Sequence, residues 1–256
     1  MDKIVKNITI GIRHKRIFRI RDNFGKFIDC ILHNSESPFS IKYFPFIDEK
    51  LSDSVILHNE DNEHFQINTD DFILRLNATD DFKKSVSRIV DDILPFIKKR
   101  IFNITKIDEI TRVGIVFSLE FFSKDKINKL ISYFTDKNIE QINNFEMRFT
   151  RKLTVDESLV KKGVNDYVNI IYTLVKKKDK MIINFDYQRY FSPELKDIND
   201  FDLGKFVESA VNNLKDTYAK WLKNYEEEQA EDNTEDGPKE SREGEETETA
   251  KTRDEK

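Results

Sequence analysis

The residues that could perform chemistry in this chain are four histidines, one cysteine and several adjacent carboxylates. Two of the histidines and three of the carboxylates lie in the stretch HNEDNEH, residues 58–64, and such a gathering of ligands suggests a metal site. A polar turn between two strands explains the same letters. Carboxylates on such a turn also lack the outer hydrogen bonds that orient metal ligands. The sequence therefore predicts neither a metal nor any other cofactor.

The cysteine, Cys30, lies three residues before His33 on a predicted helix. This spacing does not activate a thiol unless the fold adds a third group, and packing explains the cysteine more simply. The chain contains no G-x-S-x-G motif, phosphate-binding loop or dinucleotide fingerprint, and it has only seven glycines. We predict no catalytic or cofactor-binding residues, so nothing in the sequence supports an enzyme.

Basic residues are concentrated in RHKRIFRIRDNF, residues 13–24. In the overlapping stretch ITIGIRHKRIFRI, apolar residues alternate with polar ones, which is the period of a half-buried strand. This pattern predicts a strand that continues through Ile20, with Phe18 on its buried side. The exposed side of that strand would carry the three cations Arg13, Lys15 and Arg19.

The chain repeats this pattern about a hundred residues later. The stretch ITRVGIVFSLEFF alternates in the same way and is followed by residues at helical spacing. An offset of 103 places Gly11 on Gly114 and Ile12 on Ile115, with the two apolar faces in phase. Further short strands and an amphipathic helix follow each unit, so both halves read β-α-β-β-(β)-α. We interpret residues 1–103 and 104–224 as pseudo-repeats.

The fold class follows from how two such halves can bury their apolar residues. One fused, mostly antiparallel sheet with helices on a single face buries them most economically, which predicts an α+β fold in one domain, residues 1–224. One long helix is expected over about residues 81–100 and is interrupted at Pro95. The last helix has an apolar stripe from Phe206 to Trp221.

The sheet face without helices is then either solvated or a binding surface. Alternation in FEMRFTRKL points Arg148 and Lys152 outward, and alternation in IINFDYQRY points Asp186 and Gln188 outward. We expect this face to be polar, somewhat basic and short of exposed aromatics. A solvated face with cross-strand charge pairs is the first expectation, and a surface for a protein or for nucleic acid is the alternative. The candidate binding surface consists of Arg13, Lys15, Arg19, Arg148, Lys152 and Gln188.

The C-terminal segment, residues 225–256, has a composition of its own. It carries 14 acidic and five basic residues, with no Val, Ile, Leu, Phe, Trp or Met, so it cannot offset its ordering entropy by burial. We predict a disordered acidic tail. The whole chain has 48 acidic and 43 basic residues, which leaves 34 acidic and 38 basic ones in residues 1–224. The tail either solubilises the protein or covers a basic surface.

Three further properties of the sequence indicate the cellular compartment of the protein. A single cysteine excludes an intramolecular disulfide framework and suits a reducing environment. The first residues lack the apolar core of a signal peptide, and no run approaches the roughly 18 uncharged apolar residues that cross a bilayer. We predict a cytoplasmic protein that makes no membrane contact, with its oligomeric state left open.

Three segments of the second half carry a resemblance to a known family. The strand ITRVGIVFSLEF, the strand IINFDYQRY and the helix DFDLGKFVESAVNNLKDTYAKWL resemble those of a sporadically distributed family of uncharacterised bacterial and archaeal proteins of about this length. The resemblance covers residues 105–222 and extends loosely to the first half. It implies no catalytic residues. The family's patchy distribution is typical of accessory genes, including those of defence or mobile elements.

Together these observations lead to an expected function. We expect a non-enzymatic binding or adaptor protein of accessory or defence type, whose partner is another protein engaged through the open sheet face or an edge strand. The first alternative is a nucleic-acid-binding protein that uses a basic sheet face and is modulated by the acidic tail. The second alternative is an enzyme with a site between the two halves.

Overall fold

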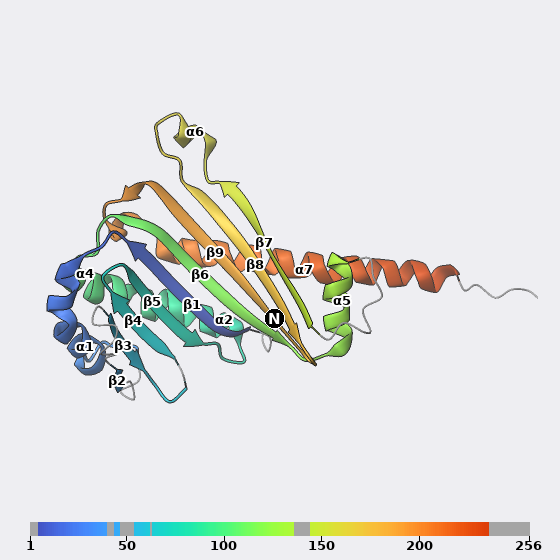
Figure 1. Cartoon of the computed structure of the whole chain (residues 1–256), viewed down its shortest axis with the longest axis horizontal. Coiled ribbons are helices and arrows are strands. Elements are labelled where there is room, and N and C mark those ends of the chain that lie inside the picture. The colour runs from blue at the N-terminus through green and yellow to red at the C-terminus, as the bar shows by residue number, and fades with distance from the viewer. Residues whose placement is uncertain (1–4, 40–43, 47–53, 62, 136–143, 236–256) are drawn as a thin grey trace, which may run out of the picture.

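The computed structural model describes residues 5–39, 44–46, 54–61, 63–135 and 144–235. Their strands form one antiparallel sheet of nine strands, and helices α2 and α7 lie behind it in Figure 1. The expected α+β class and antiparallel pairing are therefore confirmed. No helix of these residues is apolar enough over a sufficient length to cross a membrane.

The strands follow the order β2-β3-β4-β5-β1-β6-β9-β8-β7 across the sheet. The outermost strands, β2 and β7, are far apart in space, whereas β1 and β6 pair at the centre. The bounds of the strands are β1 Val5–His14, β2 Phe44–Phe46, β3 Ser54–His58, β4 His64–Asn68, β5 Asp71–Asn77, β6 Ile110–Phe121, β7 Asn144–Thr154, β8 Tyr167–Lys177 and β9 Lys180–Leu195.

The helices cover one face of the sheet and its ends. The expected helix near residues 81–100 is a continuous helical run from Phe82 to Thr105, in which π-helical turns flank Pro95. Proline lacks the N–H that an α-helix needs, and the hydrogen-bond pattern changes to π-helical on either side of Pro95, but the helix is not divided there. The bounds are η1 Phe18–Asn23, α1 Phe24–His33, α2 Phe82–Ser87, η2 Arg88–Ile93, α3 Leu94–Phe96, η3 Ile97–Ile101, α4 Phe102–Thr105, α5 Lys124–Phe134, α6 Glu157–Val160, η4 Ile198–Asp200 and α7 Leu203–Glu235.

The core lies between the sheet and the helices, and it is continuous across both halves of the chain. Ile12 and Ile115 are both fully buried on this side, as their alternation predicts. Phenylalanines link the two layers: Phe82 of α2 packs edge-on against Phe117 of β6, at 5.8 Å between ring centroids. Phe117 in turn lies 6.2 Å from Phe185 of β9. Because β1, β4, β5, β6, β8 and β9 present alternate apolar residues to this layer, most of their polar side chains lie on the opposite face.

The first strand is shorter than its alternation predicts. β1 ends at His14, and residues 18–23 form the 3-10 helix η1, so the expected strand through Ile20 is wrong. The chain leaves the sheet because Lys15 donates its N–H to Glu109 O and Ile17 donates to Thr69 O, outside the ladder. Phe18 is consequently 61% exposed rather than buried.

Helix α7 continues to Glu235, into the segment for which disorder is expected. The side chains beyond Trp221 and the whole of residues 236–256 lie outside the described residues. The expectation that the acidic tail modulates a basic surface concerns these residues and stays a prediction.

A buried histidine on the core side makes the stability of the fold depend on pH. His14 is 3% exposed, and its Nε2 has no hydrogen-bond partner while Nδ1 lies 2.8 Å from Lys15 O. Burial lowers the pKa of His14 below its ordinary value of 6.5, although the Lys15 carbonyl and nearby aspartates oppose the shift. Below about pH 6.5 the unfolded chain therefore takes up a proton that the folded chain binds only at lower pH.

We expect the free energy of unfolding to fall between pH 7.5 and 5.5 by less in His14→Phe than in the natural chain. Urea unfolding at the two pH values measures the difference. His64, whose pKa burial also lowers, contributes equally to both chains and cancels. An identical pH dependence of the two chains would show that His14 does not carry this effect.

Candidate functional site

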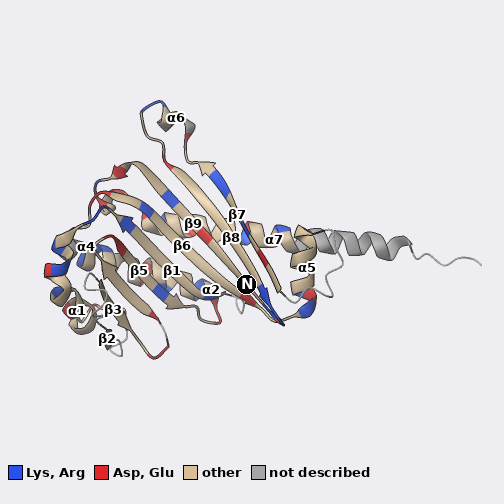
Figure 2. Ribbon diagram, viewed as in Figure 1, with Lys and Arg blue, Asp and Glu red and all other residues tan. Residues whose placement is uncertain are grey.

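The sheet face opposite the helices, called the open face below, carries the candidate binding surface (Figure 2). Register aligns its side chains in rows that cross the strands. One row contains Tyr167, Tyr190, Arg112, Arg13 and Asp71. The next row on the same face contains Lys152, Asn169, Gln188, Gly114, Gly11, Ile73, Gln66 and Ile56.

Four of the six residues expected on the candidate surface lie on the open face: Arg13, Arg148, Lys152 and Gln188. The prediction is wrong for the other two, Lys15 and Arg19, because β1 ends before them. Lys15 lies past the strand and forms salt bridges with Glu109 at 3.6 Å and Glu194 at 3.3 Å. Arg19 lies on η1, where it donates to Asp108 at 3.0 Å and to Lys106 O at 2.6 Å.

Sequence reasoning missed several residues that the sheet brings to the same face. The sequence could have predicted Arg112 on this face, because alternation in ITRVGIVFSLEF places it on the side of the strand opposite the buried Val113. Arg75 alternates in the same way with the buried Leu74 and Leu76. Tyr167 and Tyr190 contradict the expectation that the face is short of aromatics, because only the register of β8 on β9 makes them neighbours.

The two tyrosines form a stack that supports a cation at each end. Their rings are nearly parallel, at 8° and 4.7 Å between centroids. The Nζ of Lys152 lies 4.1 Å above the Tyr167 ring, and the Arg112 guanidinium lies 5.8 Å from the Tyr190 centroid. Since cations and neighbouring rings cover the ring faces, the stack holds Lys152 and Arg112 in place through cation–π attraction.

Four cations on the open face have no acidic partner among the described residues. In register, Arg148 faces Thr173, Lys152 faces Asn169 and Arg75 faces Thr9 and His64. Arg112 faces Arg13 and Tyr190, and only Arg13 faces an acid, Asp71, at 3.9 Å. Among the described residues, the four cations Arg75, Arg112, Arg148 and Lys152 form no salt bridge. The cross-strand charge pairs expected of a solvated face are present between Arg13 and Asp71 and between Lys180 and Glu120, and these four cations add positive charge beside them.

A hollow of about 270 Å³ lies at the centre of the open face, and we call it the central hollow. Its floor is the directly paired Gly11 and Gly114, and Arg13 and Arg112 stand beside each other at one end. The remaining lining residues are Thr9, Ile12, Asp71, Ile73, Val116, Asp186 and Gln188. A shallow space with two arginines over bare backbone is suited to a small anionic group.

One wall of the central hollow is a hydrogen-bonded chain along β9. The Tyr190 hydroxyl donates to Gln188 Oε1 at 2.7 Å, and Gln188 Nε2 donates to Asp186 Oδ2. Burial raises the pKa of Asp186, opposed by the bond from Gln188 and by the charges of Arg112 and Arg148. Asp186 thus contributes a carboxylate that the neighbouring cations only partly offset.

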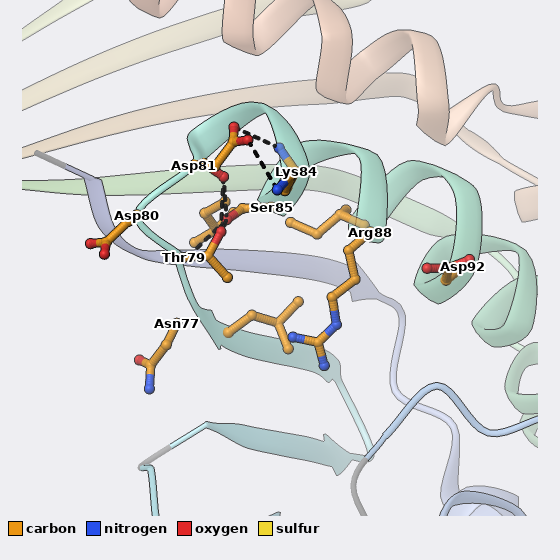
Figure 3. A pocket seen from close by; sticks show the side chains of 11 residues that line it. Asn77, Thr79, Asp80, Asp81, Lys84, Ser85, Arg88 and Asp92 are labelled. Carbon is orange, nitrogen blue, oxygen red and sulfur yellow. Dashed lines mark hydrogen bonds and ion pairs between the residues drawn. The ribbon is translucent and has the colours of Figure 1, made fainter. Parts of the chain in front are cut away.

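A larger cavity of about 620 Å³ opens on the other side of the sheet beside α2 (Figure 3). Several of its polar groups already have structural partners: Asp81 caps α2 by accepting from the N–H groups of Lys83 and Lys84. Arg88, which reaches toward the strands in Figure 3, lies 3.8 Å from the buried Glu63 carboxylate. Because these groups hold α2 and the neighbouring strands, this cavity is a weaker candidate for a binding site than the central hollow.

The residues that first suggested chemistry have structural roles. Glu63 of the HNEDNEH stretch accepts from Asn59 Nδ2 and from the Asn77 N–H, both at 3.0 Å. In the part of the chain that the structure describes, no three His, Cys, Asp or Glu side chains could hold a metal ion. Burial raises the pKa of the Cys30 thiol, which favours the unreactive protonated form.

Comparisons with protein-family models, with curated proteins and with solved structures found no match to the chain. The resemblance to the sporadically distributed family therefore stays a prediction. The function has to be argued from the geometry of the open face alone.

Proposed function

We propose that this protein is a non-enzymatic binding protein that takes nucleic acid on the open face of its sheet. The observation that carries the proposal is the set of four open-face cations without a salt bridge among the described residues, Arg75, Arg112, Arg148 and Lys152. Two arginines away from this face, Arg16 and Arg189, are instead paired with carboxylates at 2.9 and 2.7 Å. Unpaired arginine and lysine on a broad sheet are what a phosphate backbone requires.

A duplicated fold is part of the proposal, because it accounts for the width of the face. With the outermost strand β2 left out, the strand order reads inward alike from the two sides, β3-β4-β5-β1 and β7-β8-β9-β6. The central pair, Gly11 and Gly114, is also the pair related by the offset of 103 residues. A pseudo-twofold axis through this pair would make each half present one side of a continuous surface to an elongated ligand.

A protein partner at the sheet edge is the competing function, and the edge argues against it. β7 is the outermost strand of the second half, and its exposed side chains include Arg148, Arg151 and Lys152. Positive charges on an edge strand discourage the addition of another strand. The same charges favour a polyanion, so the geometry supports nucleic acid before an adaptor role.

The proposal predicts weak, strongly salt-dependent binding. Four free cations would neutralise roughly four phosphates, so the logarithm of the association constant should fall with log salt at a slope of about −3 to −4. Fluorescence anisotropy of labelled single-stranded and duplex oligonucleotides, between about 20 and 200 mM salt, measures this slope for the full chain.

Polyglutamate of matching charge serves as the competitor in that titration. If it displaces the oligonucleotide as well as unlabelled oligonucleotide does, the face selects any acidic polymer and an acidic protein becomes the better partner. Absence of binding to either oligonucleotide at the lowest salt would contradict the proposed function.

A further inference from the structure

Two arginines lie side by side at the centre of the open face, in a hollow that the carboxylates of Asp71 and Asp186 also line. Arg13 of β1 and Arg112 of β6 are directly opposite each other in the antiparallel ladder. Like charges in such positions destabilise a sheet. Asp71 offsets them poorly, because its closest approach to Arg13 is 3.9 Å and no salt bridge of Arg112 exists among the described residues. Tyr190 holds Arg112 through its ring and its hydroxyl, but it adds no negative charge to the arginine pair.

The two glycines beside these arginines have no steric reason to be glycine. A Cβ on Gly11 would meet only Phe72 O, at 3.9 Å, and a Cβ on Gly114 would meet Gln188 Cγ at an ordinary 3.5 Å. Neither glycine has the positive φ that excludes other residues. Glycine inside a strand costs about 0.5–1 kcal/mol relative to alanine. Two glycines in register therefore weaken the sheet at its centre, and what they create is the floor of the central hollow.

We propose that the central hollow is a phosphate site, in which the guanidinium groups of Arg13 and Arg112 bind one phosphate group above the bare backbone of Gly11 and Gly114. Guanidinium groups present their N–H donors in a fork that matches phosphate oxygens, and two of them together match its charge. The Tyr190 ring beside Arg112 fixes one fork. Asp186, on the opposite wall, repels the anion toward the arginines and offers an acceptor to a donor group on the rest of the ligand.

The inference rests on the proposed function for its ligand, which is a phosphate carried by nucleic acid. The phosphate can be a terminal monoester or an internal diester, and both present the same oxygens to the arginines. The hollow of about 270 Å³ leaves room for part of the attached sugar. The site would therefore set the position of one phosphate along the bound strand, while the outlying cations contact the others.

A side chain placed on the floor of the central hollow gives the sharpest test, because it should block phosphate binding without lowering the stability of the fold. Gly11→Val places a side chain into open space and improves the strand propensity, so the unfolding midpoint in urea should be unchanged or higher. Titration with inorganic phosphate, followed by heteronuclear NMR, should show binding to the natural chain and none to this variant. Arg112→Gln should weaken phosphate binding about tenfold to a hundredfold. Thr173→Val, elsewhere on the open face, is the matched control and should bind phosphate as the natural chain does.

Oligonucleotides with a 5′-phosphate and with a 5′-hydroxyl distinguish a terminal phosphate monoester from an internal phosphodiester as the bound group. A preference for the 5′-phosphate that Gly11→Val abolishes assigns the site to a terminal monoester, whereas equal weakening of both by the variant assigns it to an internal diester. If Gly11→Val and Arg112→Gln bind phosphate and both oligonucleotides as the natural chain does, the phosphate site is wrong and the proposed function stands. If the natural chain binds phosphate but no oligonucleotide, the proposed function is wrong and the phosphate site stands.

Discussion

Reversing two charges on the open face, with Arg148→Glu and Lys152→Glu in one chain, will weaken oligonucleotide binding by about a hundredfold at about 50 mM salt. Each lost phosphate contact removes about 0.9 from the salt slope, so two contacts account for this factor before any repulsion by the new carboxylates. Both residues are exposed on the edge strand β7 and face Thr173 and Asn169, so their replacement breaks no salt bridge among the described residues.

The matched control places the same charge change on the helical side. Lys215 and Lys220 are exposed on α7, which lies behind the sheet in Figure 1. Lys215→Glu with Lys220→Glu should weaken binding by no more than about threefold, through the change in net charge alone. Equal losses in the two double variants, measured by anisotropy at the same salt, would mean that binding follows net charge and not the open face.

The largest effect on stability is expected from Phe117→Ala, which should lower the free energy of unfolding by about 3–5 kcal/mol. Phe117 has no exposed surface and contacts Phe82 of the covering helix as well as Phe185 of the next strand. Its removal leaves a cavity where the sheet and helix layers meet, in the middle of the core. Urea unfolding measures the loss.

Phe18 provides the control for this substitution. Although alternation places it in the core, it is 61% exposed on η1, so Phe18→Ala should change the free energy of unfolding by no more than about 0.5 kcal/mol. A large loss at Phe18 with a small one at Phe117 would contradict the burial described for both residues.

Alternation with period two predicted much of the fold and part of the site, because the side of a strand on which a residue lies is a local property. It placed Arg148, Lys152 and Gln188 on the open face and Ile115 in the core. It failed where the letters continue to alternate after the strand has ended. The end of β1 depends on hydrogen bonds from Lys15 and Ile17 to distant segments, which a local pattern does not contain.

The rest of the site depends on which strands are neighbours and in which register. Nothing local indicates that Tyr167 stacks on Tyr190, or that Arg13 lies opposite Arg112. One signal was present but was interpreted differently: the offset of 103 aligned Gly11 with Gly114 and was taken as evidence of duplication. Only the paired register shows that the two glycines form a common floor.

The most direct test of the account is ultraviolet cross-linking of the full chain to a single-stranded oligonucleotide, followed by mass spectrometry of the linked peptides. The account predicts cross-links on peptides that carry open-face residues of β6, β8 and β9, with Tyr167 and Tyr190 as the most reactive positions. Cross-links confined to peptides of α2 and α7, on the covered side of the sheet, would contradict it.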